Sequence, residues 1–387
     1  MSTTAFGAQS DGPGAIPLPA PDSTNLDPPD AAEVDRLAAS VVDVLVDDAT
    51  PLTDVQELVL TAVFESMTGH RPTLARGHEA MGLGSLSTMA DRNEAFRTRI
   101  VQQMILGALL VRPPSHAAVE RIREASRRLH VADGMIDIAA EFADGQLELA
   151  AIDFDRNGYT GGWGAERTVV LHTSLPVVAA WQQAADDAAL AARWAALEDL
   201  PEETLGQAVT RFYRARGFQY PGRAGSVSPL LAQHDWVHVL ADYGATIDNE
   251  LEVFAFIARA NDDPRGFSFL AMVVSLFESG MLASGAGLFE PDAGHLRIEG
   301  MPERLADAMR RGAECTGSID FLGLDWFELA DRPIEDVRAE FGIGPKRAGL
   351  RSPGPFEPGG MTSYQLEAGR AAAAARGETH ETWGAAP

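Results

Sequence analysis

The sequence is poor in cysteine and lysine, with only Cys315 and Lys346 in 387 residues. A single cysteine excludes an internal disulfide and any metal site built from several thiolates. A phosphate-binding loop of the Walker type needs Gly-Lys-Ser/Thr, whereas Lys346 stands in Gly-Pro-Lys-Arg. Schiff-base chemistry is unexpected in a chain with a single lysine.

Basic charge is also scarce. Lysine and arginine together number 31 against 56 acidic residues, which gives a net charge of −25. Such a charge repels phosphate backbones and disfavours electrostatic docking on anionic lipid. We therefore expect no nucleic-acid partner.

Long apolar runs are missing as well. The longest candidate, Phe267–Phe277, is shorter than the ~18–20 residues that a membrane span needs. The first 29 residues contain neither a basic stretch nor an apolar stretch of the kind that forms a secretory signal. We expect a cytoplasmic protein with at most peripheral contact to the inner face of the cell membrane.

Proline and glycine divide the chain. Residues 1–32 and 344–387 combine many prolines or alanines with few large apolar residues, so both tails are predicted to be disordered, with a transient helix over Gln365–Arg376 as the alternative in the second. A Gly-rich stretch at 158–164 predicts a boundary between two helical units, 33–157 and 166–343. The sequence does not indicate a role for the first unit.

The apolar period between the tails is helical. Thr53 to Gln56 is a capping-box pattern that opens a helix, and further helices are predicted at 92–111 and 115–129. Only 167–171 reads as a short strand. The predicted fold is an all-α, multi-helix bundle. The segment 153–158 looks like the start of an EF-hand loop, but position 12 of that loop is Gly164, so a polar turn is favoured.

The most informative segment is 228–260. Its first half predicts a helix on which His234 and His238 lie one turn apart on the apolar face, with Asp235 beside them. Its second half predicts a helix that begins near Thr246 and carries Glu250 on its apolar face. A buried carboxylate is costly unless it is paired or binds a metal ion.

The spacing predicts that these side chains face each other. His238 lies six residues before Gly244 and Glu250 six residues after it, so the two lie at one level if the helices are antiparallel neighbours. Two imidazoles and a carboxylate suit a zinc ion with an open position or an iron ion. The alternative is a salt-bridged His–Glu pair in the core.

These residues also carry a resemblance. His-Asp-x-x-His at 234–238, followed after eleven residues by Glu250, resembles the metal motif of the coenzyme Q biosynthesis protein 4 family. The resemblance covers about 193–343, and its supporting segments are Leu200–Gly206, Phe212-Tyr213, Arg311-Gly312, Asp325–Glu328, Arg332–Arg338 and Phe341–Ile343.

The resemblance implies an all-α protein of ubiquinone synthesis that removes the C1 carboxyl of a polyprenylated hydroxybenzoate, which is a lyase reaction. It implies His234, Asp235, His238 and Glu250 as ligands of a divalent metal, with zinc expected first and iron as the alternative. It also implies a prenylated quinone precursor or another isoprenoid lipid as ligand, and other quinone-biosynthesis enzymes as partners. No residue is assigned to catalysis beyond the metal ligands.

Two further expectations concern the surroundings of the site. The polyprenyl tail needs an apolar groove, for which we predict one side of the helix around 267–277, with Phe269, Met272, Val273 and Leu276. The alternative is that this helix is plain core. Glu252 is expected on the outer face of the second helix.

Two other functions compete with a decarboxylase. A non-catalytic lipid-binding scaffold could keep the metal for structure, and it gains support if Asp235 closes the coordination of a tetrahedral zinc. A phosphohydrolase of the His-Asp type would need a further upstream histidine and a downstream aspartate in the same core, and the sequence does not assign either.

Overall fold

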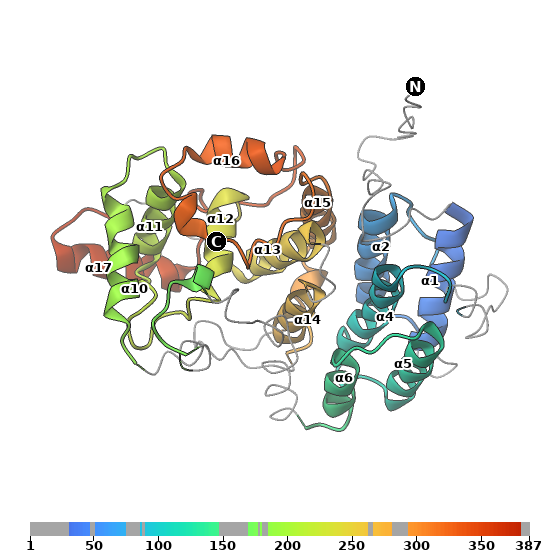
Figure 1. Cartoon of the computed structure of the whole chain (residues 1–387). Helices are drawn as coiled ribbons and strands as arrows, with labels where there is room; N and C mark the ends of the chain where they lie inside the picture. Colours follow the sequence, from blue (N-terminus) through green and yellow to red (C-terminus); the bar gives the residue numbers. More distant parts are fainter. Residues whose placement is uncertain are drawn as a thin grey trace. The chain divides into compact units, whose positions relative to one another are not determined.

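The computed structural model describes residues 31–46, 51–74, 86, 90–146, 169–176, 179, 185–261, 266–280 and 293–380. Within these ranges the chain is all-α, and a bridge between Thr204 and Pro333 is the sole β pairing (Figure 1). The chain divides into an N-terminal unit, described up to Gln146, and a C-terminal unit, described from residue 169. The predicted boundary at 158–164 and the EF-hand-like segment lie outside the described residues.

The N-terminal unit is a small helical bundle in which α1, α4 and α5 pack on one another and α2 and α6 pack on α4. Its first helix begins at Ala31, within the tail that was expected to be disordered; residues 1–30 lie outside the described ranges. The helices are α1 (Ala31–Leu45), α2 (Asp54–Thr68), α4 (Glu94–Leu109), α5 (His116–Leu129) and α6 (Met135–Ala143).

Local sequence signals set the ends of these helices. Thr53 and Gln56 form the predicted capping box, and Gly69 ends α2 in the left-handed region at φ 72°. Asn93 and Ser115 cap α4 and α5 through their side chains. The predicted strand is wrong, because its described part, Val169–Leu171, is a turn of 3-10 helix.

The C-terminal unit is built around α12 and α13. Every residue of α12 is buried, as is every residue of α13 from Asn249 to Ala260. The α12 helix is covered by α11 and α16, while α13 is covered by α14 and α15. The helices are α10 (Ala188–Ala195), α11 (Leu205–Arg216), α12 (Ala232–Leu240), α13 (Ile247–Ala260), α14 (Gly266–Phe277), α15 (Met301–Ala313), α16 (Ile334–Phe341) and α17 (Ser363–Arg376).

The C-terminal tail is ordered where it was expected to be disordered. Residues 344–380 are described, and α17 packs along α11. A Cβ on Gly369 would fall 1.9 Å from the Ala215 carbonyl oxygen, so only glycine permits this approach. The sequence indicated at most a transient helix at 365–376, because α17 packs through small residues rather than a stripe of large ones.

The position of Glu252 also differs from the prediction. It was expected on the outer face of α13, but it is buried and forms an ion pair with Arg304 of α15 at 2.6 Å. The covering helix α15 supplies the positive charge that makes burial of this carboxylate acceptable. In the described part of the chain, no helix has both the length and the apolar character that crossing a membrane requires.

Candidate metal centre

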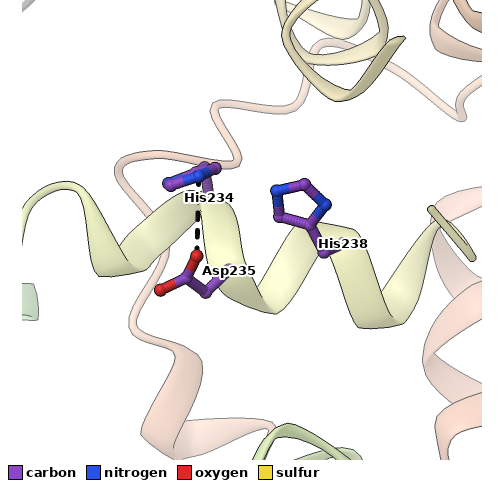
Figure 2. A group of neighbouring side chains, drawn as sticks. All are labelled: His234, Asp235 and His238. Carbon is purple, nitrogen blue, oxygen red and sulfur yellow. Dashed lines mark ion pairs between the residues drawn. The ribbon is translucent and has the colours of Figure 1, made fainter. Parts of the chain in front are cut away.

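The α12 helix carries three of the four predicted ligands. Figure 2 shows His234 and His238 one turn apart, with Asp235 next to His234. One nitrogen of each histidine and one oxygen of Asp235 lie within 4.8 Å of one another. The three side chains are therefore close enough to share one ion.

The α13 helix carries the fourth predicted ligand, Glu250. Oε2 of Glu250 lies 3.3 Å from Nε2 of His234, and Oε1 lies 3.3 Å from Nε2 of His238. Oδ1 of Asp235 lies 3.5 Å from Nε2 of His234. The six-residue spacing on each side of Gly244 thus places the carboxylate between the two imidazoles, at the predicted level.

Backbone carbonyls fix the tautomer of both histidines. Nδ1 of His238 donates to the carbonyl oxygen of Gly244 at 2.6 Å, and Nδ1 of His234 donates to that of Leu231. Because a carbonyl oxygen only accepts, the proton is on Nδ1 and the lone pair of a neutral imidazole is on Nε2. Both Nε2 lone pairs therefore face Glu250, the arrangement that metal-ligating histidines adopt.

This cluster contains acceptors but no donor among its inner atoms, so it needs a cation, either protons on the imidazoles or a metal ion. Nε2 of His238 is buried and has no hydrogen-bond partner in the structure. Two atoms bound to one tetrahedral ion at ~2.0–2.1 Å are about 3.3 Å apart, which matches both Nε2–carboxylate distances. The residues present fit a divalent metal.

Aromatic side chains surround the cluster. Tyr213 of α11 donates its hydroxyl to Oδ2 of Asp235, which leaves Oδ1 facing His234. The ring of Phe212 stacks on His238, and the ring of Phe254 stacks on His234. His238 is fully buried, whereas the side chains of His234, Asp235 and Glu250 keep about a tenth of their surface exposed. A ligand from solvent therefore reaches the cluster from the His234 side.

The turn that holds His238 depends on the C-terminal segment. Gly244 donates its backbone N–H to the Pro353 carbonyl at 2.9 Å, and Ala245 donates to that of Gly360 at 2.8 Å. The amide of Gln365, at the start of α17, donates to the Ala245 carbonyl at 2.7 Å. Ordering of residues 353–365 thus positions the carbonyl that orients His238.

A buried arginine fastens the same segment from the other side. Arg216 is fully buried and donates to the carbonyls of Pro355 and Gly360 at 2.9 and 2.8 Å. Burial lowers the pKa of Arg216 to about 9. The negative charges of Asp235 and Glu250 act in the opposite direction and raise this pKa, but burial has the larger effect. The positive charge of Arg216 therefore partly balances the two carboxylates.

Charge couples the members of the cluster. Burial favours neutral His234, but the carboxylates of Asp235 and Glu250 outweigh it and raise the pKa of His234 to about 9. Burial likewise favours a protonated Glu250, but the two histidines hold its pKa well below the usual range. The pKa of Asp235 is raised, chiefly by burial. Without a metal ion, Glu250 is an anion beside a protonated His234.

The predicted lipid-binding residues lie on α14, which packs on α13. Val273 is buried in the core, whereas Met272 and Leu276, one turn apart, are half-buried. The side chain of Phe269 lies outside the described part of the chain. The structure therefore places Met272 and Leu276 on one partly accessible strip next to the helix that carries Glu250.

Sequence reasoning missed most of the outer contacts of the site. Tyr213 entered only through the resemblance, Gln365 was named only as the start of a transient helix, and Arg216 was not singled out. Gln365 had a usable signal, because Thr362 and Gln365 form a capping-box pattern that predicts the start of α17. Arg216 had none, since the carbonyls that it binds are about 140 residues away in the sequence.

Known proteins resemble this chain only distantly. No family model matches it, and no curated protein matches it. A crystal structure of a candidate ubiquinone biosynthesis protein from Nostoc punctiforme is similar to part of this chain, with 19% sequence identity and a TM-score of 0.30. The match covers 55% of this chain and 95% of that protein. That superposition is too loose to carry a functional argument, so function is argued from the residues of the site.

Proposed function

We propose that this chain is a metal-dependent protein of ubiquinone or related prenyl-quinone synthesis that removes the C1 carboxyl of a polyprenylated hydroxybenzoate. The observation that carries the proposal is the convergence of the Nε2 atoms of His234 and His238 on the Glu250 carboxylate, each at 3.3 Å. The resemblance of the 234–250 motif to the coenzyme Q biosynthesis protein 4 family supplies the substrate class.

His234, His238 and Glu250 would hold the metal, and Asp235 would be either a fourth ligand through Oδ1 or an acceptor beside His234 that leaves a position open for substrate. A bound divalent ion supplies positive charge that stabilises the negative charge developing on the ring as carbon dioxide leaves. The backbone carbonyls at Leu231 and Gly244 keep the imidazole protons on Nδ1. The rings of Phe212 and Phe254 stack on His238 and His234 and cover one face of each imidazole.

The prenyl tail needs an apolar surface near this centre. The half-buried strip of Met272 and Leu276 on α14 is the surface we assign to it. Because α14 packs on α13, a chain lying along this strip would extend from the helix that carries Glu250.

A non-catalytic scaffold is the second candidate, and the position of Asp235 favours it. Tyr213 holds Oδ2 of Asp235 so that Oδ1 faces His234. Four protein ligands would close the coordination of a tetrahedral zinc and leave no position for substrate. A metal of higher coordination number would retain open positions.

The first test is metal content and carboxyl release. We expect about one equivalent of zinc or iron per chain by plasma mass spectrometry, lost in His238→Ala because an inner ligand is gone. His116→Ala, which removes an exposed histidine paired with Asp144, is the control and keeps the metal. Carboxyl-labelled prenyl hydroxybenzoate should then release labelled carbon dioxide with the wild-type protein and not with His238→Ala.

The outcomes separate the candidates. A metal-loaded protein that binds the prenyl substrate but releases no labelled carbon dioxide would be the scaffold. A folded protein purified without chelator that contains no metal would contradict both, and the cluster would then be a buried polar network.

A further inference from the structure

Tyr213 contributes a hydroxyl group to the metal centre from a third helix. It is fully buried on α11, which packs on α12, and its hydroxyl donates to Oδ2 of Asp235. Oδ1 of the same carboxylate lies 3.5 Å from Nε2 of His234. The two oxygens of Asp235 therefore have different neighbours, one on α11 and one inside the centre.

The ring of Tyr213 is held on several sides. Its centroid lies 5.2 Å from that of Trp194, 5.7 Å from that of Tyr220 and 5.9 Å from that of Phe218. Such packing leaves the ring little freedom to move, so the hydroxyl stays at one point. A hydrogen bond to a charged acceptor is among the stronger ones in proteins, so Asp235 cannot turn without losing a strong contact.

This hydrogen bond determines how many oxygens Asp235 can offer to a metal ion. A carboxylate that chelates an ion points both oxygens at it, whereas Tyr213 holds Oδ2 of Asp235 toward α11. Asp235 can therefore offer Oδ1 alone. With the Nε2 atoms of His234 and His238 and one oxygen of Glu250, the centre then has at most four protein donors.

We propose that Tyr213 is a positioning residue that restricts Asp235 to one oxygen and thereby makes the centre selective for zinc. The inference rests on the metal-dependent function proposed above. Four nitrogen and oxygen donors suit tetrahedral zinc, whereas additional oxygen donors and a larger coordination number suit manganese. Without the hydroxyl of Tyr213, Asp235 is free to turn both oxygens toward the ion.

Tyr213→Phe tests the inference, because it removes the hydroxyl and keeps the ring. Competition with a chromophoric chelator measures the affinity of the full-length protein for zinc and for manganese(II). We expect zinc affinity to fall roughly tenfold, the lower end of the effect of losing a hydrogen bond to a metal ligand. Manganese affinity should stay the same or rise, because the second oxygen of Asp235 becomes a donor. The preference for zinc should therefore decrease by roughly tenfold or more.

Tyr243→Phe is the matched control. Tyr243 is also buried and packs its ring against Phe256, but its hydroxyl hydrogen-bonds to no carboxylate among the described residues. Removing that hydroxyl should leave the preference for zinc over manganese unchanged. Circular dichroism of both variants confirms that the α-helical fold is retained.

Cobalt(II) spectroscopy reports the coordination number. Four-coordinate cobalt absorbs visible light more strongly than six-coordinate cobalt, because a tetrahedral site has no centre of symmetry. The wild-type and Tyr243→Phe proteins loaded with cobalt should show strong bands, and Tyr213→Phe should show weaker ones. In an Asp235→Ala background, Tyr213→Phe should change neither the spectrum nor the metal preference, since the carboxylate through which Tyr213 acts is gone.

The outcomes separate this inference from a packing role and from the proposed function. Equal losses of zinc and manganese affinity in Tyr213→Phe, with an unchanged cobalt spectrum, would show that Tyr213 only supports packing and would overturn the inference. Weak cobalt bands in the wild-type protein would overturn it as well. A wild-type protein that takes up none of the three metals would overturn both this inference and the proposed function. A metal-loaded protein with the expected spectra that releases no carbon dioxide would overturn the proposed decarboxylation alone.

Discussion

At the scale of single residues, the defining property of the centre is that its inner atoms only accept when both imidazoles are neutral. The tautomers of His234 and His238 are set by the carbonyls of Leu231, which directly precedes α12, and of Gly244 in the following turn. When both rings are neutral their protons are on Nδ1 and the carboxylate of Glu250 meets two lone pairs, so either a proton on Nε2 of His234 or a metal ion must supply positive charge. Protons and metal ions therefore compete for the same atoms.

This competition predicts a pH dependence of metal affinity. The pKa of His234 is about 9 without metal, so at lower pH a proton must leave before the metal binds. The affinity should therefore rise with pH, roughly tenfold per unit between pH 6 and 8 from this proton alone. Competition with a chromophoric chelator at three pH values, corrected for the chelator's own protonation, measures it.

Asp235→Asn provides the contrast. Removing this negative charge lowers the pKa of His234, so the dependence should level off at a lower pH than in the wild-type protein. If the metal affinity of the wild-type protein does not change between pH 6 and 8, then metal binding does not release a proton from His234, and the prediction is wrong.

At the scale of elements, α12 and α13 position the centre, but α17 completes it. Gln365 has two roles at once: its Oε1 caps α17 at Thr362, and its Nε2 donates to the Ala245 carbonyl. The turn at 244–245 therefore cannot move without breaking contacts to the C-terminal segment.

Gln365→Glu separates these roles. Glutamate at this position keeps the capping box but replaces the donor to Ala245 with an acceptor. We expect metal affinity to fall roughly tenfold, because the turn that carries the Gly244 carbonyl, the partner of His238, loses a contact that positions it. The chelator competition assay measures it.

The N-terminal unit offers a matched control. Gln56 occupies the same capping-box position in α2, and its Nε2 donates to the Gly107 carbonyl at 2.8 Å. Gln56→Glu should destabilise the fold by a similar mechanism and leave metal affinity unchanged. A similar loss of affinity in both variants would attribute the effect to general destabilisation.

At the scale of the whole molecule, the chain consists of two compact units, and only one carries the described ligands. All four ligands, their carbonyl partners and Arg216 belong to the C-terminal unit. The covering helices α11, α14, α15, α16 and α17 belong to it too.

A pair of truncations tests this division. A chain that begins at Leu147 should retain about one metal equivalent, whereas a full-length chain that ends at Ile343 should lose it, because the partners of Gly244 and Ala245 are removed. Metal content and chelator competition measure both. Loss of the metal on removing residues 1–146 would show that the N-terminal unit contributes to the centre.

The sequence by itself determined the helical fold, the helix starts at Thr53, Ser115 and Thr246, and the approach of His238 and Glu250. These features depend on short-range rules of capping, period and rise per residue, which operate within one or two helical turns.

Only the tertiary structure decided the rest. It ordered residues 344–380, buried Glu252 against Arg304, and brought Arg216 and Gln365 to the site. Each of these depends on a partner 50 to 145 residues away, or on glycine and alanine packing that leaves no apolar period. Ion pairs between distant residues and close approaches of two backbones leave no local sequence pattern, so they can be identified only in the folded chain.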